Sequence, residues 1–405
     1  MQISHWHATL DRPPLPAIDL PATANVVVVG AGVVGAATAL WLARAGLKPL
    51  VIDRQGPAAG ASGHNGGILS AGLAENYLAA TARYGKQATR ELYGLSLAGQ
   101  QLLVELIEQE RIDCDLRLHG NLNLTIGEAQ LTIAATTVAA LQADGFPAAL
   151  LDRDSAQELV RIPLGAAITG GRFNPAAGTL HSGKLVYGLL EAADRYGAQF
   201  CWNVTLHQVT AAETGLRLIT SRGSVATGAA VITINAWSGE VLPELSQRIK
   251  PVRGQVLCTM PVDPFIMCGF GASLTPTGEY GQQLPGGQVL FGGCRAVAPD
   301  QDVGVSAGEV SADVQHALEV GLGRLFPTLA GIAIERRWSG QMAFTADYLP
   351  IVANPLPNLF AVGGFSGHGM PFAAIVGRHL AEAVQTGTIP SALELLSCER
   401  ETLIW

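Results

Sequence analysis

The chain has 405 residues, which is long for one hydrophobic core and predicts two or three domains or one large composite fold. Hydrophobic residues make up 48% of it, charged residues 14%, and 48 residues are glycine, a composition typical of a compact α/β enzyme with many tight turns. The net charge is −8 and no basic cluster occurs, which argues against nucleic-acid binding.

The first residues predict an extended arm on the surface. Residues 1–21 contain four prolines and no apolar run, so they do not fit a secretory signal or a membrane span. His5 and His7 have a metal-like spacing, but we expect them to be solvated on the arm and assign no metal site. No later stretch looks like a membrane-spanning helix, so we expect a soluble protein.

The six cysteines are scattered without a Cys-x-x-Cys spacing. This pattern disfavours a zinc site and a disulfide framework alike. We expect reduced thiols and a cytoplasmic protein.

A nucleotide-binding pattern follows the arm. The β-branched run 26–29 predicts a strand buried on both faces of a parallel sheet. Residues 33–45 predict a helix rich in alanine and leucine. A G-x-G-x-x-G motif, formed by Gly30, Gly32 and Gly35, spans the turn between them and the first turn of this helix.

A second strand, 49–52, ends at Asp53, about 20 residues after the glycines. In this arrangement the glycines permit the tight turn, the approach of a pyrophosphate and close packing of helix on strand. The acid accepts hydrogen bonds from the ribose. The sequence therefore predicts a bound dinucleotide.

Two later segments bear on which dinucleotide binds. A strand at 359–362 runs into a glycine-rich loop, and Pro371 opens a helix that continues to about residue 384. The positive end of such a helix suits a partner that becomes anionic, as the pyrimidine edge of a flavin does on reduction. Residues 229–245 predict a further buried strand that leaves into a loop.

Six stretches in the same order resemble the D-amino-acid oxidase-like family of FAD-dependent oxidoreductases, which includes glycine oxidase, sarcosine oxidase and γ-glutamylputrescine oxidase. They are VVGAGVVGAATALWLARAGLKPLVID, GASGHNGG, VITINAWSGEVLPEL, IKPVRGQVL, EYGQQLPGGQVLFGGCR and NLFAVGGFSGHGM. The resemblance implies an α/β fold, α+β overall, with a Rossmann-like FAD-binding domain and a discontinuous substrate domain on a mixed or antiparallel sheet. We expect the FAD-binding domain at 22–90, 152–248 and 336–405, and the substrate domain at 91–151 and 249–335.

The same resemblance implies the residues that contact FAD. They are Gly30, Gly32, Val33, Val34, Gly35, Asp53, Arg54, Ala61, Ser62, His64, Asn65, Gly66, Gly67, Ile68, Asn235, Ala236, Trp237, Gly340, Gly364, Phe365, Ser366, Gly367, His368, Gly369 and Met370.

The chemistry implied by the family is oxidation of a C–N bond, with hydride transfer to flavin N5 and an imine that hydrolyses. Three residues are candidates for the substrate side of the site. Arg295 is either a substrate anchor or part of a salt bridge, Tyr280 lines the pocket or packs in the core, and His368 acts on the cofactor or caps its loop. Cys294 is expected to be a core residue and not a flavin link.

Cations that relatives use are missing here. The carboxylate-binding positions of relatives fall on Met342, Gly367, Ser70 and Pro371, and the lysine that sarcosine-type oxidases place over the flavin falls on Leu290. We therefore expect a site that does not favour a simple α-amino acid and that binds a small-molecule amine or amino-acid derivative, long or N-substituted, with its charge elsewhere. We also expect slow reoxidation by oxygen. The alternatives are a 2-hydroxy-acid dehydrogenase or oxidase and a non-catalytic flavin-binding subunit of a larger dehydrogenase.

His64 lies in the loop GASGHNGG, a few residues after Asp53. More distant members of the family, the dimethylglycine and sarcosine dehydrogenases, bond a histidine of the matching loop to the flavin 8α carbon. The resemblance leaves three roles open for His64: a covalent bond to FAD, a non-covalent contact with it, or a structural role.

Overall fold

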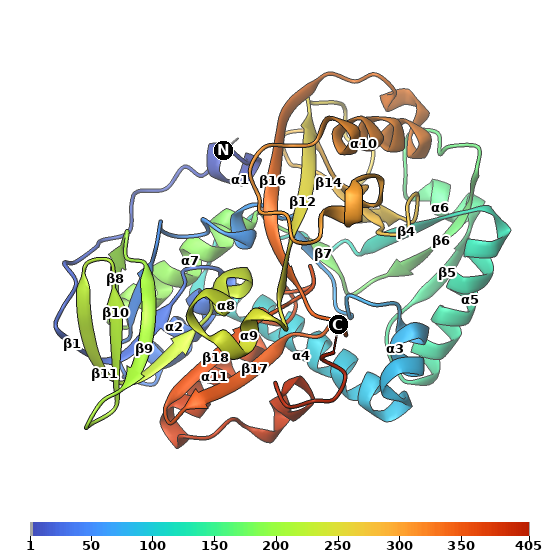
Figure 1. Ribbon diagram of the computed structural model, residues 1–405. Helices are drawn as coiled ribbons and strands as arrows, with labels where there is room; N and C mark the ends of the chain where they lie inside the picture. The colour runs from blue at the N-terminus through green and yellow to red at the C-terminus, as the bar shows by residue number, and fades with distance from the viewer. Residues whose placement is uncertain (1–2, 405) are drawn as a thin grey trace.

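The computed structural model describes residues 3–404, which form two large sheets joined by several crossings of the chain (Figure 1). The first sheet has the order β17-β18-β11-β1-β2-β8, with β10 and β9 continuing from β11. Its strands are β1 (Thr23–Val29), β2 (Leu50–Asp53), β8 (Gln199–Trp202), β9 (Leu206–Ala211), β10 (Leu216–Thr220), β11 (Gly223–Ile232), β17 (Ile351–Leu356) and β18 (Leu359–Gly363).

The centre of the first sheet is parallel, since β1 pairs in parallel with β2 and with β11. Valines 26–29 of β1 are buried, as the predicted strand requires. Helices cover one face, where their apolar sides share a hydrophobic core with the sheet. They are α2 (Val33–Arg44), α4 (Lys86–Glu110), α7 (Ser182–Arg195) and α11 (Ala373–Thr386).

The second sheet has the order β16-β12-β15-β14-β13-β4-β6-β5 and is mixed, because β13 pairs in parallel with β4 while its other pairs are antiparallel. Its strands are β4 (Asn121–Ile126), β5 (Ala149–Asp152), β6 (Ile168–Asn174), β12 (Lys250–Thr259), β13 (Gly269–Ala272), β14 (Glu279–Gln283), β15 (Val289–Gly293) and β16 (Ile334–Phe344). One face carries a second core under α10 (Ala312–Leu325), and the other face looks toward the first sheet. The predicted α/β fold class with a Rossmann-like and a mixed-sheet part is confirmed.

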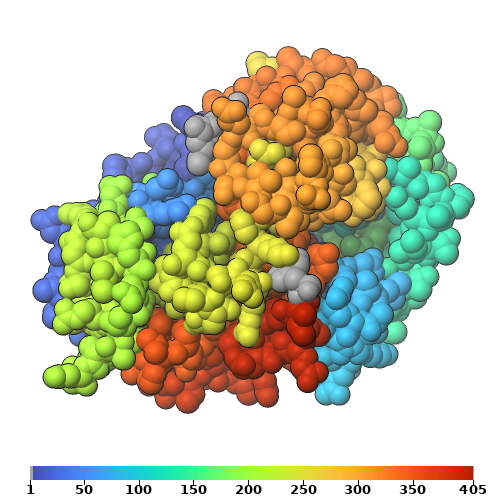
Figure 2. All heavy atoms as spheres, viewed as in Figure 1, coloured from blue at the N-terminus to red at the C-terminus, as the bar shows by residue number. Residues whose placement is uncertain are grey.

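Smaller elements complete the fold. They are α1 (His5–Ala8), α3 (Tyr77–Tyr84), α5 (Gly127–Ala143), α6 (Arg153–Glu158), α8 (Ser238–Val241), α9 (Pro243–Ser246), and the strand pair β3 (Ile68–Leu69) and β7 (Gly178–Thr179). In Figure 2 the segment of α8 and α9, in yellow, lies on the same face as the orange segment that follows β15.

Two strands lie elsewhere than we expected. The predicted segments placed β6 and β16 in the FAD-binding domain, but both belong to the second sheet. β16 pairs with β12 along its length, from Lys250 opposite Phe344 to Thr259 opposite Ile334. The hydrogen bonds to β12 place β16 in the second sheet, although β12 lies some 80 residues earlier in the chain.

The N-terminal residues also differ from the expected extended surface arm. Residues 5–8 form α1, in which Trp6 is 1% exposed and His5 is buried rather than solvated. The cause is Trp6, which packs with apolar residues of β12 and β16. Burial of an indole outweighs the cost of ordering a short helix.

The six cysteines are free. Across residues 3–404, no helix is long and apolar enough to cross a membrane. Within the same residues no cluster of side chains has the composition of a metal site.

Candidate active site

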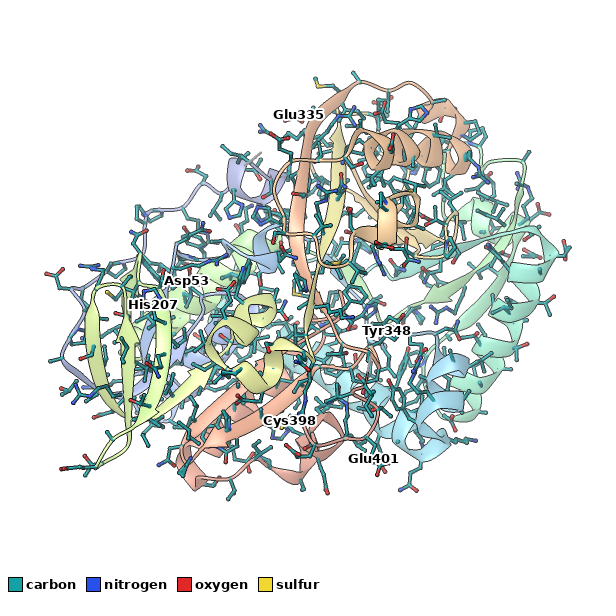
Figure 3. The ribbon with its side chains drawn as sticks, viewed as in Figure 1. Asp53, His207, Glu335, Tyr348, Cys398 and Glu401 are labelled. Atoms are coloured by element: carbon teal, nitrogen blue, oxygen red, sulfur yellow. The ribbon has the colours of Figure 1, made fainter. Side chains whose placement is uncertain are left out.

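A cavity of about 970 Å³ lies between the two sheets, lined by residues of both. Figure 3 labels residues at its two ends: Asp53 at the carboxyl end of β2, on the left of the view, and Tyr348 on the right. The first end is formed by the glycine motif, and the second by residues of the second sheet together with the loop between β16 and β17.

The glycine motif forms a cradle that has no room for side chains. Gly30 has φ +109°, and a Cβ atom on it would lie 2.8 Å from Thr233 Oγ1. A Cβ on Gly32 would lie 3.0 Å from Ser62 Oγ, which accepts a hydrogen bond from the backbone N–H of Val33. The N-terminus of α2 thus opens into the cavity with no bulk in front of it. Such a cradle binds a pyrophosphate.

Asp53 joins this cradle to the loop after β2. Its Oδ2 accepts a hydrogen bond from Ala31 N (2.9 Å), and its Oδ1 accepts hydrogen bonds from Gln55 N (2.8 Å) and Gly56 N (2.9 Å). Since a carboxylate has about four lone-pair sites, Asp53 can still accept a hydrogen bond from a ribose hydroxyl.

Beside Asp53, the guanidinium of Arg54 lies 4.0 Å from the centre of the Trp237 ring. Both side chains line the cavity. The stacked pair forms an apolar and cationic wall suited to the adenosine end of a dinucleotide.

The loop that contains His64 forms the middle of the cavity. His64 is 9% exposed, and its Nδ1 lies 2.8 Å from Gly60 O. A carbonyl only accepts, so Nδ1 carries the proton and Nε2 keeps its lone pair in the neutral ring. Burial lowers the pKa of His64 and favours this neutral form.

Side chains from elsewhere fix this loop from behind. Trp338 Nε1 donates to His64 O (3.0 Å), and Trp6 Nε1 donates to Asn65 O (2.7 Å). Ser4 Oγ donates to Gly63 O (2.6 Å). Residues of α1 and its N-cap therefore brace the loop, which the sequence did not indicate.

His64 also contacts β16 directly. A Cβ atom on Gly340 would lie 2.7 Å from His64 Cβ. Only glycine at this position lets the loop approach the strand.

The last glycine-rich loop closes the cavity on the side of α11. Asn235 Oδ1 accepts a hydrogen bond from Gly364 N (2.9 Å), which ties this loop to the end of β11. Gly367 has φ +83°. His368 follows it, and burial lowers the pKa of His368 to about 4, with a further contribution from the charge of Arg172. The predicted helix start at Pro371 lies two residues before the observed start at Ala373.

Tyr280 connects the His64 loop with the second sheet. A Cβ on Gly66 would lie 2.5 Å from its Cε2, and a Cβ on Gly292 would lie 2.7 Å from its hydroxyl oxygen. The ring therefore lies between two glycines and lines the cavity. Burial raises the pKa of Tyr280 to about 12, so the hydroxyl keeps its proton at neutral pH.

Arg295 reaches the far end of the cavity. Its Nη1 donates to Gln301 O (3.2 Å), and its guanidinium lies 4.8 Å from the centre of the Phe344 ring. No described carboxylate lies within salt-bridge distance of it. The sequence left two roles open for Arg295, a substrate anchor or a salt bridge. For the salt bridge, residues 3–404 contain no acidic partner.

The cavity brings together most of the residues that the resemblance nominated. Arg295, Tyr280 and His368 all line it. So do Gly30, Gly32, Val33, Val34, Asp53, Arg54, Ala61, Ser62, His64, Asn65, Gly66, Gly67, Ile68, Asn235, Trp237, Gly340, Phe365, Ser366, Gly367, Gly369 and Met370. Gly35, Ala236 and Gly364 support it from outside the lining.

Two other positions considered in the sequence also find their place. Cys294 is buried against Glu279 in the core of the second sheet, with Sγ 3.5 Å from the carboxylate. Met342 lines the cavity and brings no charge to it.

One cavity residue was missed by the sequence reasoning. Arg172 of β6 lines the cavity, pairs in register with Asn123 of β4, and makes no side-chain hydrogen bond or ion pair within the described chain. The expected domain segments put β6 in the FAD-binding domain, so its arginine was not considered. The available signal was an arginine in the strand AITGGRFN, where it follows two small residues.

The residues present fit FAD. The cradle leaves the first turn of α2 open, Arg54 and Trp237 form a wall beside the ribose position, and the glycines of the His64 loop and of β16 leave room for a flat ring. The cavity continues from there to Arg172 and Arg295, where a small molecule can reach the same ring.

Comparisons with known proteins point the same way. The family model described as DAO, FAD dependent oxidoreductase, matches residues 25–383. Gamma-glutamylputrescine oxidoreductase of Escherichia coli is 26% identical, over 94% of this chain and 88% of its own. D-amino acid dehydrogenase of Allorhizobium ampelinum is 27% identical, over 89% and 94%.

Solved structures share the fold. Glycine oxidase of Geobacillus kaustophilus superposes with a TM-score of 0.79 at 22% identity, covering 94% of this chain and all of that one. L-proline dehydrogenase of P. horikoshii superposes with a TM-score of 0.76 at 21% identity, covering 92% and 96%.

Proposed function

Because this chain belongs to the DAO family of FAD dependent oxidoreductases, it is a flavoenzyme that acts on amines or amino acids, and we propose that it oxidises the C–N bond of an amino-acid derivative. The single observation that carries the proposal is the continuity of one cavity from the dinucleotide cradle to a polar end in the second sheet. FAD bound in the cradle supplies an acceptor for the hydride that leaves the carbon beside the nitrogen.

The residues of the chain bind and orient the substrate. Tyr280 packs against the His64 loop, and His368 lies in the last glycine loop. Both are neutral at pH 7, since burial raises the pKa of Tyr280 to about 12 and lowers that of His368 to about 4. A neutral imidazole and a protonated phenol can hold an uncharged amine by hydrogen bonds. Neither group adds a positive charge that would repel the substrate.

Mixing the yellow holoprotein without oxygen with amines, amino acids and 2-hydroxy acids tests this function. We expect amino acids or their N-substituted forms to bleach the flavin absorbance. Bleaching by hydroxy acids alone would make the protein a hydroxy-acid dehydrogenase, and bleaching by none would make it a flavin-binding subunit. Reoxidation in air then measures its oxidase character.

We also propose that His64 contacts the flavin through Nε2. Supporting this are the proton on Nδ1, which is used on Gly60 O, and the place of the ring in the cavity wall. Denaturing gels of the wild type and of His64→Ala distinguish the two kinds of contact. A fluorescent wild-type band that the variant lacks means a covalent histidyl–FAD bond, while a dark band with full release of FAD means a non-covalent contact.

His7→Gln is the matched control, because the His7 ring lies 5.1 Å from the His64 ring behind the loop.

Finally, we propose a cytoplasmic location, supported by six free cysteines.

A further inference from the structure

Arg172 stands out among the arginines of this chain because its half-buried charge faces the cavity without a partner. Arg400 forms two hydrogen bonds to Asp347, and Arg253 forms two to Asp302. Arg153 donates to three backbone carbonyls. The guanidinium of Arg172 has none of these contacts, and burial lowers its pKa. A partly desolvated cation without a counter-charge is stabilised by a ligand that brings a negative charge.

The strand geometry directs this side chain into the cavity. The next residue of β6, Phe173, packs into the core under α10. Since successive side chains of a strand point to opposite faces, Arg172 faces the other way, and it lines the cavity. Its cross-strand partner Asn123 faces the same way, and a Cβ on Gly271 would come 2.6 Å from Asn123 Oδ1.

The surroundings of Arg172 form one polar corner. Asn123 has no side-chain hydrogen bond within residues 3–404, and the neighbouring Asn121 has a buried Oδ1 without a partner. The charge of Arg172 acts on Tyr93 of α4 and on His368 of the last glycine loop. This corner, made of Arg172, Asn123, Tyr93 and His368, therefore adjoins the loop that borders the flavin position.

The acids near this end of the cavity are already used. Glu75 pairs with Arg83 at 2.9 Å. Glu279 accepts hydrogen bonds from Leu274 N and from Thr275 Oγ1. The far end of the cavity therefore carries the unpaired positive charges of Arg172 and Arg295. Neither Glu75 nor Glu279 is free to bind the second ammonium group of a diamine.

We propose that Arg172, together with the amide of Asn123, binds the carboxylate of the substrate, and this proposal rests on the proposed function. The substrate is therefore an amino acid or an N-substituted amino acid and not a diamine. A guanidinium binds a carboxylate through two parallel N–H···O bonds, and the Asn123 amide can donate a third. The pyrophosphate cradle lies at the opposite end of the cavity, so the cofactor phosphates do not reach Arg172.

The same corner would set the orientation of the substrate. With its carboxylate on Arg172, the α-carbon and nitrogen lie toward His368 and the flavin loop. A diamine would place a second ammonium beside the guanidinium, and two like charges in a buried site repel strongly. Arg172 is in this account a specificity-determining residue.

Benzoate binding to the holoprotein tests the proposal without turnover. Benzoate is titrated against the flavin absorbance of the wild type, Arg172→Gln, Arg172→Lys and Arg378→Gln, with benzamide as the neutral control; Arg378 is an exposed arginine of α11 that does not line the cavity. We expect Arg172→Gln to weaken benzoate binding at least tenfold, Arg172→Lys to retain part of it, and Arg378→Gln to change it less than threefold. Equal binding by the wild type and Arg172→Gln, or no binding of benzoate by the wild type, would overturn the proposal.

A second variant keeps the test decisive if Arg172→Gln does not fold. Asn123→Asp places a carboxylate in register with Arg172 and leaves the guanidinium in place. We expect this internal partner to abolish benzoate binding while FAD stays bound. Benzoate affinity as in the wild type would contradict the assignment of the corner.

Substrate pairs that differ only in the carboxylate separate this proposal from the proposed function. We expect kcat/KM of the wild type to be at least tenfold higher for proline than for pyrrolidine or for sarcosine than for dimethylamine, and Arg172→Gln to lose this preference mainly through KM. Oxidation of both members of a pair with equal kcat/KM would leave amine oxidation standing and refute the role of Arg172. Oxidation of neither, with normal benzoate binding, would refute the proposed function and leave the carboxylate site standing.

Discussion

Trp6→Ala is the perturbation that tests the brace formed by α1 behind the His64 loop. Trp6 is 1% exposed and donates to Asn65 O at 2.7 Å. A buried tryptophan removes about 200 Å² from water, worth about 5 kcal/mol at 25 cal/mol per Å². Truncation of a buried tryptophan to alanine typically costs about 3–5 kcal/mol. We expect the free energy of unfolding to fall by about 3 kcal/mol.

This loss can be read as a melting temperature. An unfolding entropy of about 2.1 cal/mol/K per residue gives about 0.85 kcal/mol/K for 405 residues, so Tm should fall by about 3–4 °C. Because Trp6 holds the loop that we propose borders the flavin, we also expect FAD affinity to fall at least tenfold. Scanning calorimetry with and without added FAD measures the change in Tm. The ratio of flavin to protein absorbance after dialysis measures the loss of FAD affinity.

Two controls separate bracing from general stability. Trp6→Phe keeps an aromatic ring but loses the hydrogen bond to Asn65, and should cost about 1 kcal/mol. Phe326→Ala removes a ring that is fully buried in the core under α10 and does not line the cavity, and it should lower Tm without releasing FAD. If Trp6→Ala keeps its FAD and its Tm, or if Phe326→Ala loses FAD equally, the brace does not act as described.

Two further predictions concern buried charges. Arg400→Ala leaves the fully buried Asp347 without its partner and should cost about 3–5 kcal/mol in urea unfolding; loss of less than 1 kcal/mol would refute the role of the pair. Burial alone would raise the pKa of Asp347, but Arg400 holds it below its usual range, so the contribution of the pair is present above about pH 4 and is lost as the pH falls through the lowered pKa. Burial lowers the pKa of His181 to about 4 in the folded chain, so on acidification the unfolded chain is protonated at His181 before the folded chain is. The free energy of unfolding should therefore fall as the pH drops from about 6.5 to 4. His181→Asn, which can still accept the hydrogen bond from Lys184 N at the start of α7, should flatten that slope in urea midpoints, and an unchanged slope would assign it to other groups.

The sequence allowed the nucleotide-binding half to be predicted because its signals are local. A β-branched strand, three glycines, a helix and Asp53 follow one another within thirty residues, and each has one physical role. The last glycine loop and its helix were predicted for the same reason. Glycine positions such as Gly340 could be placed at the cofactor only through the family resemblance.

The substrate end could not be predicted in this way because its residues meet through pairing between distant strands. β6 lies beside β4, and β16 beside β12, and the sequence does not state these partners. The role that we propose for Arg172 depends on that pairing, since the strand alone does not show which face is buried. α1 was missed because four residues with a tryptophan carry no helix signal until the hydrophobic contacts around Trp6 exist.

The contacts of α1 also determine when the protein can complete its fold. Residues 5–8 leave the ribosome well before the strands that they contact, because Trp6 packs against residues of β12 and β16, which are synthesised some 250 and 330 residues later. Until Trp338 has emerged, the loop that it and Trp6 both hold through hydrogen bonds has no brace. During synthesis the nucleotide cradle can therefore form early, whereas the pocket for the flavin ring forms late, and the newly made chain passes through a stage in which it can hold only half of its cofactor.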